Sequence, residues 1–338
     1  MKRILVVNAN WLGDVLFSTP SIRAIRKKFP ESYLACLVPF RAENVLLRNP
    51  HLNEVIVYDD RVSFLSPSFW RMVLKLKKKN FDSAFFFHRS KTKVLLAKLA
   101  GIEERFGYSS PARDRFLTRI CPAPPVSEHK IDYFLNLLEC FEIPSDGRSM
   151  DFVADPAAEK KVWELLVSEG VRKGEPYAVV HAGGNWDLKR WPAEHFAQWI
   201  HLYKKEFPGK IILCGTEPEN GIAIEIKSHF SKEVLSVCGK TSFDELAHLL
   251  KNAEFLLSND SGPIHLAAAL KTKIVGIFGP TSPQLTGPIS EAPVKILWKD
   301  VGCDVPCYYQ SCHYRVCMDW IAPEEVFEKT KQLLEVKV

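Results

Sequence analysis

Short runs of apolar residues alternate along the chain with longer segments in which apolar residues recur every three or four positions. The short runs predict buried β-strands, and the longer segments predict amphipathic helices. In the first half, strands are predicted at residues 4–7, 33–38, 55–58 and 83–87, and helices at 14–29, 41–48, 69–79, 91–100 and 131–141. Residues 107–127, rich in Pro, Ser and Arg, are predicted to form a long exposed loop.

The same alternation continues through the second half. Strands are predicted at residues 177–180, 210–214, 234–237, 254–257 and 273–278, and helices at 157–169, 193–206, 217–229, 242–251, 261–269 and 324–336. Strands separated by helices of this length are typical of parallel sheets with right-handed crossovers. The pattern therefore predicts an α/β chain with two doubly wound, Rossmann-like domains that face a central cleft.

A change of composition at residues 144–155, where Pro, Gly, Ser and Asp gather, marks the expected boundary between the domains. A chain of 338 residues has the length of two ordinary domains. We therefore predict an N-terminal domain at residues 1–150 and a C-terminal domain at residues 151–322. Residues 323–338 are predicted to form a last helix that packs back on the N-terminal domain.

With 46% hydrophobic and 25% charged residues, the chain has an ordinary globular composition. No apolar run approaches the ~20 residues that are needed to span a bilayer. The first apolar run is interrupted by Asn8, Asn10 and Asp14, which favours a buried strand over a signal peptide. The expected location is therefore the cytoplasm.

The net charge of +5 is unevenly divided between the two halves. Residues 1–150 contain 24 Lys and Arg against 15 Asp and Glu, whereas residues 151–338 contain 21 against 25. A basic first half indicates an anionic partner, such as a phosphorylated substrate, an acidic membrane surface or nucleic acid. A solvated basic face on a soluble enzyme accounts for the same charge.

The segment Phe255–Leu270 combines an apolar strand with an immediately following helix. Such a corner presents helix N–H groups and the positive end of the helix dipole, which together attract an anion. Asp260 and Ser261 are residue types that cap helices, Gly262 follows them, and His265 lies one turn further along. The corner predicts a phosphate site, although an ordinary capped helix with a core histidine fits the same pattern.

A second predicted anion site follows the strand at residues 177–180. Gly183 and Gly184 leave backbone amides accessible to an oxyanion, and Lys189 adds a positive charge. The carboxyl ends of parallel strands meet at one edge of the sheet, so we expect this loop to lie beside the Asp260 corner and to form a diphosphate site with it. The alternative is a Gly-Gly turn with a surface lysine. The chain has neither G-x-G-x-x-G nor a P-loop motif, which argues against a nicotinamide dehydrogenase or a P-loop NTPase.

In the first domain, Asp14 follows the first predicted strand. A carboxylate in the first turn of a helix stabilises the helix dipole by ~0.3–1 kcal/mol. At the end of a central strand, the same carboxylate is also placed to accept a proton from an attacking hydroxyl group. The residues alone leave both interpretations open.

Four of the nine cysteines lie close together in the sequence, at Cys303, Cys307, Cys312 and Cys317. Their C-x₃-C-x₄-C-x₄-C spacing differs from the paired C-x₂-C spacing of zinc ribbons. A metal site and a reduced or partly bridged structural loop both remain open. The other cysteines are scattered, and Cys214 and Cys238, which end apolar runs, are predicted to be core residues.

Three motifs in this order resemble glycosyltransferase family 9, the bacterial ADP-heptose:lipopolysaccharide heptosyltransferases. They are W-x-G-D-x-x-x-x-T-P near the N-terminus, H-x-G-[GA] with a later K-R-W-P, and D-S-G-x-x-H followed by G-x-F-G-P-T. The resemblance covers almost the whole chain. The tryptophan before the Gly-Asp pair and the late cysteine cluster are more similar to the heptosyltransferase II branch than to heptosyltransferase I.

The resemblance implies the GT-B arrangement and an inverting transfer of heptose from ADP-heptose. The family's catalytic base matches Asp14, and its diphosphate-binding lysine matches Lys189. The remaining expected donor-site residues are Gly183, Gly184, Asp260, Ser261, Gly262, His265 and a ribose-binding glutamate near Glu217 or Glu219, of which we prefer Glu219. The acceptor groove of the family falls on Arg89, Ser90 and Lys91.

The resemblance further implies a set of partners. The acceptor is the phosphorylated inner core of lipopolysaccharide, reached by peripheral contact with the cytoplasmic face of the inner membrane. Nucleic acid is not an expected partner. No metal or other cofactor is expected to be required, since Lys189 and helix amides offset the charge on the leaving diphosphate. The alternative hypotheses for the function are a transferase of another nucleotide-activated sugar, a nucleotide-sugar 2-epimerase, and a two-lobed small-molecule binding protein.

Overall fold

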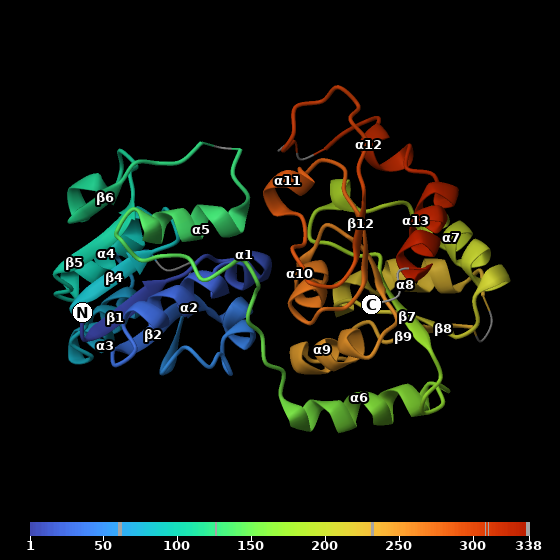
Figure 1. Ribbon diagram of the computed structural model, residues 1–338, viewed down its shortest axis with the longest axis horizontal. Helices are drawn as coiled ribbons and strands as arrows, with labels where there is room; N and C mark the ends of the chain where they lie inside the picture. Colours follow the sequence, from blue (N-terminus) through green and yellow to red (C-terminus); the bar gives the residue numbers. More distant parts are fainter. Residues whose placement is uncertain (60–62, 126, 231–232, 308, 310, 336–338) are drawn as a thin grey trace. The chain divides into compact units, whose positions relative to one another are not determined.

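The computed structural model describes residues 1–59, 63–125, 127–230, 233–307, 309 and 311–335. The chain folds into two compact units, Met1–Val153 and Ala154–Val338. Each unit contains one six-stranded sheet with helices packed against it (Figure 1). All the strand pairs are parallel, as the alternating pattern predicts.

The sheet of the first unit has the strand order β3-β2-β1-β4-β5-β6. Its strands are β1 (Arg3–Val7), β2 (Tyr33–Pro39), β3 (Glu54–Tyr58), β4 (Ser83–Phe86), β5 (Glu104–Tyr108) and β6 (Arg119–Cys121). Its helices are α1 (Leu12–Phe17), α2 (Thr19–Lys28), α3 (Pro67–Lys78), α4 (Lys91–Leu99) and α5 (Lys130–Glu139), with 3₁₀ turns η1 (Phe40–Val45) and η2 (Asp114–Phe116). The central strand β1 is buried almost throughout, which explains its unbroken apolar run.

The sheet of the second unit has the strand order β12-β11-β10-β7-β8-β9. Its strands are β7 (Tyr177–His181), β8 (Lys210–Leu213), β9 (Val234–Ser236), β10 (Leu256–Asn259), β11 (Ile274–Ile277) and β12 (Val294–Leu297). Its helices are α6 (Pro156–Ser168), α7 (Ala193–Glu206), α8 (Asn220–Lys227), α9 (Phe243–Lys251), α10 (Gly262–Ala269), α11 (Pro283–Thr286), α12 (Val316–Asp319) and α13 (Pro323–Glu335), with 3₁₀ turns η3 (Asp187–Lys189) and η4 (Glu217–Glu219).

The two sheets share one doubly wound topology. In each, the first three strands spread in one direction and the next three in the other, so the order reverses between β1 and β4 in the first unit and between β7 and β10 in the second. Loops that leave the carboxyl ends of strands at such a switch point are the usual ligand-binding loops of this fold. The predicted site loops leave the ends of these strands.

Four details of the first unit differ from the sequence expectation, one of which is that the helix predicted at residues 41–48 is the 3₁₀ turn η1. The strands β5 and β6 were not expected, and β6 lies inside the segment 107–127 that was predicted to be a loop, because an edge strand this short carries little apolar pattern. The predicted helix at residues 14–29 is two helices. It breaks at Ser18, whose hydroxyl donates to the carbonyl of Val15 at 2.7 Å, and Pro20, in the first turn of the second helix, has no N–H to continue the first.

The C-terminal helix α13 packs against α7 and against the strands β11 and β12 of the second unit (Figure 1). Its Thr330 hydroxyl accepts a hydrogen bond from the buried indole of Trp199 at 3.2 Å. The helix therefore packs within the second unit, and its expected packing on the N-terminal domain stays a prediction. Val336, the last residue of the expected helix, lies outside the described residues.

The cysteines outside the late cluster are either disulfide-bonded or buried. A disulfide joins Cys121, at the end of β6, to Cys140, which follows α5. Cys214 and Cys238 are buried, as expected of core residues. Across the described ranges, no helix combines the length and the apolar character that crossing a bilayer requires.

Candidate active site

The loops that follow β7 and β10 lie side by side in the second unit. The two strands are hydrogen-bonded neighbours, with Ser258 opposite His181 at their carboxyl ends. Asn259 bridges the loops: its side-chain amide donates to the carbonyls of Ala182 at 2.8 Å and Gly183 at 3.1 Å, and its Oδ1 accepts from the Trp191 amide at 3.1 Å. The sequence analysis did not single out Asn259, although a polar residue at the end of an apolar strand was the available signal.

Lys189 and Asp260 form an ion pair across the two loops, with 2.7 Å between Nζ and Oδ2. The carboxylate is 5% exposed and also accepts a hydrogen bond from Thr281 Oγ1 at 2.7 Å. The imidazole of His265 is buried, with Nε2 at 3.8 Å from Asp260 Oδ1. Asp260 therefore holds the lysine in place instead of capping α10.

Ser261 occupies the N-cap position of α10, but its side chain caps no helix N–H group. The hydroxyl instead lies 3.0 Å from His181 Nδ1 and 3.1 Å from the Asn259 carbonyl oxygen. The expectation that Asp260 and Ser261 cap this helix was wrong, because each side chain has a tertiary partner on the neighbouring segment. The first turn of α10, which begins at Gly262, therefore starts without a side-chain cap.

The Glu219 side chain packs against the turn formed by Gly183 and Gly184. Its Oε1 accepts from the Gly184 amide at 2.6 Å, and its Oε2 accepts from the amide and the hydroxyl of Thr216, both at 2.7 Å. A Cβ atom on Gly183 would lie 2.1 Å from Glu219 Oε1, and Gly184 has a φ of +150°, which explains the two glycines. The Gly184 amide therefore donates to a carboxylate of the protein itself, whereas the sequence analysis expected it to be accessible.

The Glu219 carboxylate is held in its ionised form. Burial alone would raise the pKa of this carboxyl group, but the hydrogen bonds and positive charge of His181 and the hydrogen bonds from Thr216 outweigh burial and bring it to about 2. The His181 Nε2 atom lies 3.5 Å from Glu219 Oε1. Glu217, the other glutamate considered for ribose binding, is exposed and lies against Gly239.

In the first unit, Asp14 lies half-buried in the first turn of α1, just after β1. The preceding loop is held by Lys93, whose Nζ donates to the Asn8 carbonyl at 3.0 Å and to Asn10 Oδ1 at 2.7 Å. The Tyr58 hydroxyl donates to the same Asn10 oxygen at 3.1 Å. Lys93 is only 7% exposed, and the sequence analysis missed it because its partners lie more than eighty residues away.

The three expected acceptor residues have different positions after β4. Ser90 is the N-cap of α4, where its hydroxyl accepts from the Lys93 amide. Arg89 Nε donates to the Tyr133 hydroxyl at 2.8 Å, and Lys91 begins α4 with its ammonium 6.0 Å from the ring of Phe116. Of the three, Ser90 lines a cavity of this unit.

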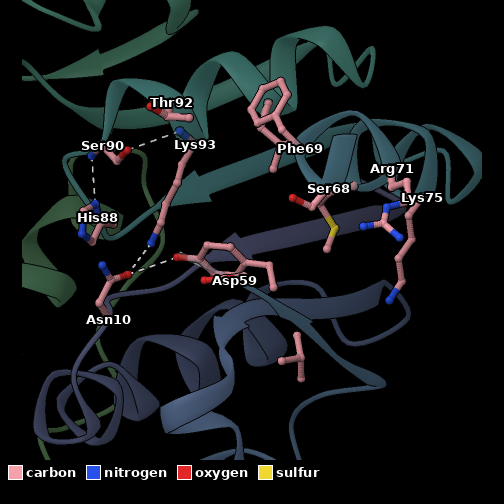
Figure 2. A pocket seen from close by; sticks show the side chains of 14 residues that line it. Asn10, Asp59, Ser68, Phe69, Arg71, Lys75, His88, Ser90, Thr92 and Lys93 are labelled. Atoms are coloured by element: carbon pink, nitrogen blue, oxygen red, sulfur yellow. Dashed lines mark hydrogen bonds between the residues drawn. The ribbon is translucent and has the colours of Figure 1, made fainter. Parts of the chain in front are cut away.

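That cavity has a volume of about 390 Å³ and lies between α3, α4 and the ends of β3 and β4. Figure 2 shows Lys93 and Asn10 on one side of it and Arg71 and Lys75 on the other. The polar and charged side chains that line it are Asn10, Tyr58, Asp59, Ser68, Arg71, Lys75, His88, Ser90, Thr92 and Lys93. Of this set, only Ser90 is among the three residues expected to bind the acceptor, because the lining comes from segments that lie far apart in the sequence.

The late cysteines gather around a second, smaller hollow of about 50 Å³. All four of them line it, and the Cys307 amide donates to the Pro280 carbonyl at 2.7 Å. Burial, followed by the neighbouring cysteines, raises the pKa of the Cys317 thiol. Among the residues that the structure describes, no group of three or more His, Cys, Asp or Glu side chains is arranged to hold a metal ion.

A model of glycosyltransferase family 9 (heptosyltransferase) matches residues 69–315, which is more than half of the chain. The chain belongs to this family. It is therefore a glycosyltransferase, and the family resemblance expected from the three sequence motifs is confirmed. The matched range includes Lys189 and the Asp260 corner, and it begins after Asp14.

Individual members of the family align along most of the chain. The lipooligosaccharide heptosyltransferase 2 of Campylobacter jejuni is 24% identical, over 98% of both chains. The lipopolysaccharide heptosyltransferase 2 of Escherichia coli is 25% identical, over 85% of this chain and 86% of the relative. The solved structure of E. coli ADP-heptose lps heptosyltransferase II has a TM-score of 0.81 at 22% identity, covering 99% of this chain and 98% of that one, and so has the same fold.

Proposed function

We propose that this glycosyltransferase moves a heptose from ADP-heptose to a hydroxyl group of the lipopolysaccharide inner core, with inversion at the anomeric carbon. Membership of the heptosyltransferase family and the names of the relatives support this donor and acceptor. The observation that carries the proposal is the Lys189–Asp260 pair beside the start of α10, at the switch point of a doubly wound sheet. That arrangement suits a nucleoside diphosphate leaving group.

The second unit would stabilise the leaving group. As the glycosidic bond breaks, negative charge grows on the diphosphate, and Lys189 with the backbone amides of Ser261 and Gly262 offsets it. Asp260 and His265 keep this corner in shape, while Gly183, Gly184 and Glu219 form the adjoining wall of the donor site. A ribose hydroxyl on Glu219 would take the one lone pair of Oε1 that Gly184 and Thr216 leave, in place of the His181 contact. This chemistry requires no cofactor.

Asp14 would act as the general base. Its carboxylate removes the proton from the acceptor hydroxyl, whose oxygen then attacks the anomeric carbon on the face opposite the diphosphate. One bond forms as the bond to the diphosphate oxygen breaks, which inverts the configuration. The stiff loop that Lys93 and Asn10 maintain fits a base whose position must be defined.

The cavity between α3 and α4 would receive the anionic part of the acceptor. Its cationic lining, with Arg71 and Lys75 opposite Lys93, suits a phosphorylated or carboxylated sugar. Ser90 contributes a hydroxyl to this lining, with Arg89 and Lys91 beside it. The acceptor is lipid-linked in this proposal, so the protein works by peripheral contact with the cytoplasmic face of the inner membrane.

A product assay tests this proposal. Purified protein is incubated with core acceptors that carry either no heptose or one heptose, together with ADP-heptose, UDP-glucose or GDP-mannose, and the products are analysed by mass spectrometry. The expected result is addition of one heptose from ADP-heptose and a larger thermal shift with ADP than with UDP or GDP. Transfer from another nucleotide sugar, or conversion of the donor without transfer, would replace this proposal with one of its rivals.

A further inference from the structure

Helix α3 and the loop before it carry an unusual exposed surface. Four large apolar side chains here are between 49% and 77% exposed: Phe64, Leu65, Trp70 and Leu74. The helix is anchored by a separate stripe, formed by the buried Phe69, Val73 and Leu76. The exposed apolar side chains are therefore not the ones that the fold uses to hold the helix in place.

The charge of the same segment has one sign. Residues 61–81 contain no Asp or Glu, while Arg71, Lys75, Lys77 and Lys78 are exposed along α3. Acidic groups on neighbouring elements lie at its margins. Glu54 is paired with Lys79 at 2.6 Å, and Asp59 lines the cavity.

Helical spacing places these residues in two adjacent stripes. Trp70, Leu74 and Lys77 follow one another at four- and three-residue intervals, so they share one face. The stripe beside it contains Arg71, Lys75 and Lys78. Exposed aromatic and aliphatic side chains flanked by lysines are the pattern of a helix that lies in the plane of a bilayer interface. An acidic protein partner with an apolar patch would use the same side chains, and vesicle flotation distinguishes it from a bilayer.

We propose that this α3 surface, defined as Phe64, Leu65, Trp70 and Leu74 with the four basic residues of α3, docks the protein on an anionic phospholipid bilayer. The apolar side chains enter the headgroup region, and the basic side chains meet the negative surface potential. With twelve residues, the helix is too short to span the membrane and lies along it.

The location of α3 connects membrane docking with acceptor binding, a connection that rests on the proposed function. Arg71 and Lys75, which belong to the α3 surface, also line the 390 Å³ cavity. A lipid-linked acceptor whose anchor stays in the bilayer would therefore present its sugar part to the cavity directly beneath the docked helix. The cavity lining does not include Trp70, Leu74, Lys77 or Lys78. Substitutions at these four residues therefore test docking and leave the acceptor-binding residues unchanged.

Vesicle flotation tests the docking. Wild-type protein is mixed with vesicles of phosphatidylcholine alone or with 40 mol% (roughly a bacterial anionic content) phosphatidylglycerol. It is expected to float with the anionic vesicles at low salt and to be released by high salt. Trp70→Ser with Leu74→Ser should lose at least about tenfold in partitioning, and Lys77→Gln with Lys78→Gln should lose about fivefold per lysine, for anionic vesicles only.

Ile224→Ser with Lys227→Gln on α8 is the matched control, because it removes one exposed apolar and one basic side chain from another helix. Equal flotation of wild type and the α3 variants would overturn the proposal, as would absence of wild-type binding. A change of oligomeric state in the α3 variants without a change in flotation would overturn it in favour of a protein interface.

A second readout separates this proposal from the enzymatic one. Transfer is measured on an acceptor embedded in vesicles and on the same acceptor with its acyl chains removed. The α3 variants should be at least tenfold slower on the embedded acceptor and unchanged on the delipidated one. If the wild type transfers heptose to neither acceptor but still floats with anionic vesicles, the proposed function fails and the docking surface stands.

Discussion

The carboxylate of Asp260 holds the ammonium group of Lys189 at 2.7 Å, between two loops whose sequences are far apart. Thr281 and His265 keep that carboxylate in place, so the position of the lysine is determined by a cluster and not by the lysine alone. A point charge that stabilises a transition state is effective only when its position is set in advance. The pair is therefore the first target for mutagenesis.

Lys189→Met should lower kcat about 10²- to 10³-fold, because it removes a preorganised cation from the leaving group. Asp260→Asn should also lower kcat, but by a smaller factor, because the lysine remains and only its ion-pair partner is lost. Steady-state kinetics at saturating donor measures both. Glu291→Gln is the control, since it breaks an exposed pair with Lys271 and should change kcat less than twofold. Unchanged kcat in Lys189→Met would remove this lysine from the mechanism.

Asp14→Asn should reduce turnover at least about 10²-fold and leave ADP affinity nearly unchanged, because it removes the proposed base while keeping the side-chain shape. Turnover is followed by release of ADP, and affinity by calorimetry. Asp132→Asn is the matched variant, since Asp132 is also a carboxylate in the first turn of a helix and lies on α5. If the two variants were equally active, Asp14 would be a helix-start residue only.

Gly183→Ala should destabilise the second unit by about 1–3 kcal/mol, because the new methyl group overlaps Glu219 Oε1. It should also weaken ADP binding by displacing the glycine turn. Gly221→Ala provides the comparison, since a Cβ atom there meets nothing within 4 Å and the helix gains propensity. Denaturant unfolding of both variants measures the difference. Combining Gly183→Ala with Glu219→Ala should restore part of the loss, and no restoration would contradict the overlap as its cause.

The low pKa of Glu219 makes stability depend on pH. The carboxyl group titrates at about 4.3 in an unfolded chain and at about 2 in the folded protein. A depressed folded-state pKa contributes stability above the unfolded value, and this contribution is lost as the pH falls toward the folded value. Between about pH 5 and pH 2, the wild type should lose up to about 3 kcal/mol more unfolding free energy than Glu219→Gln. Parallel pH profiles of the two proteins would contradict the assignment.

Most strands and helices can be predicted from the local pattern of apolar residues. For the site, this pattern predicts which loops come together but not the contacts within them. Apolar runs such as Ile4–Val7 identify the buried strands, and their alternation with helices identifies parallel sheets. The edge strands β6 and β12 escape because each contains a basic residue and buries only one side chain, so neither forms an apolar run. Parallel topology also explains why the Lys189 and Asp260 loops could be placed together without a structure.

The sequence could not assign partners within the site. Ser261 has the chemistry of a helix cap, and only the position of His181, eighty residues earlier, shows that the hydroxyl is engaged elsewhere. Glu219 likewise has the local signature of a capping box with Thr216, yet it also accepts the Gly184 amide. Local preference sets which contacts a residue is able to make, and tertiary packing decides among them.

The hydrogen bond from the Trp191 indole to the Ile321 carbonyl, at 2.9 Å, has a consequence for how the protein is made. Trp191 follows Lys189 closely and takes no part in the Lys189–Asp260 ion pair, but its amide donates to Asn259, so the Lys189 loop is linked to a segment that is synthesised 130 residues later. During translation, a nascent chain that has passed Lys189 lacks this fastening until Ile321 has left the ribosome. The Lys189 loop is thus expected to reach its final conformation late, after most of the second unit has been synthesised.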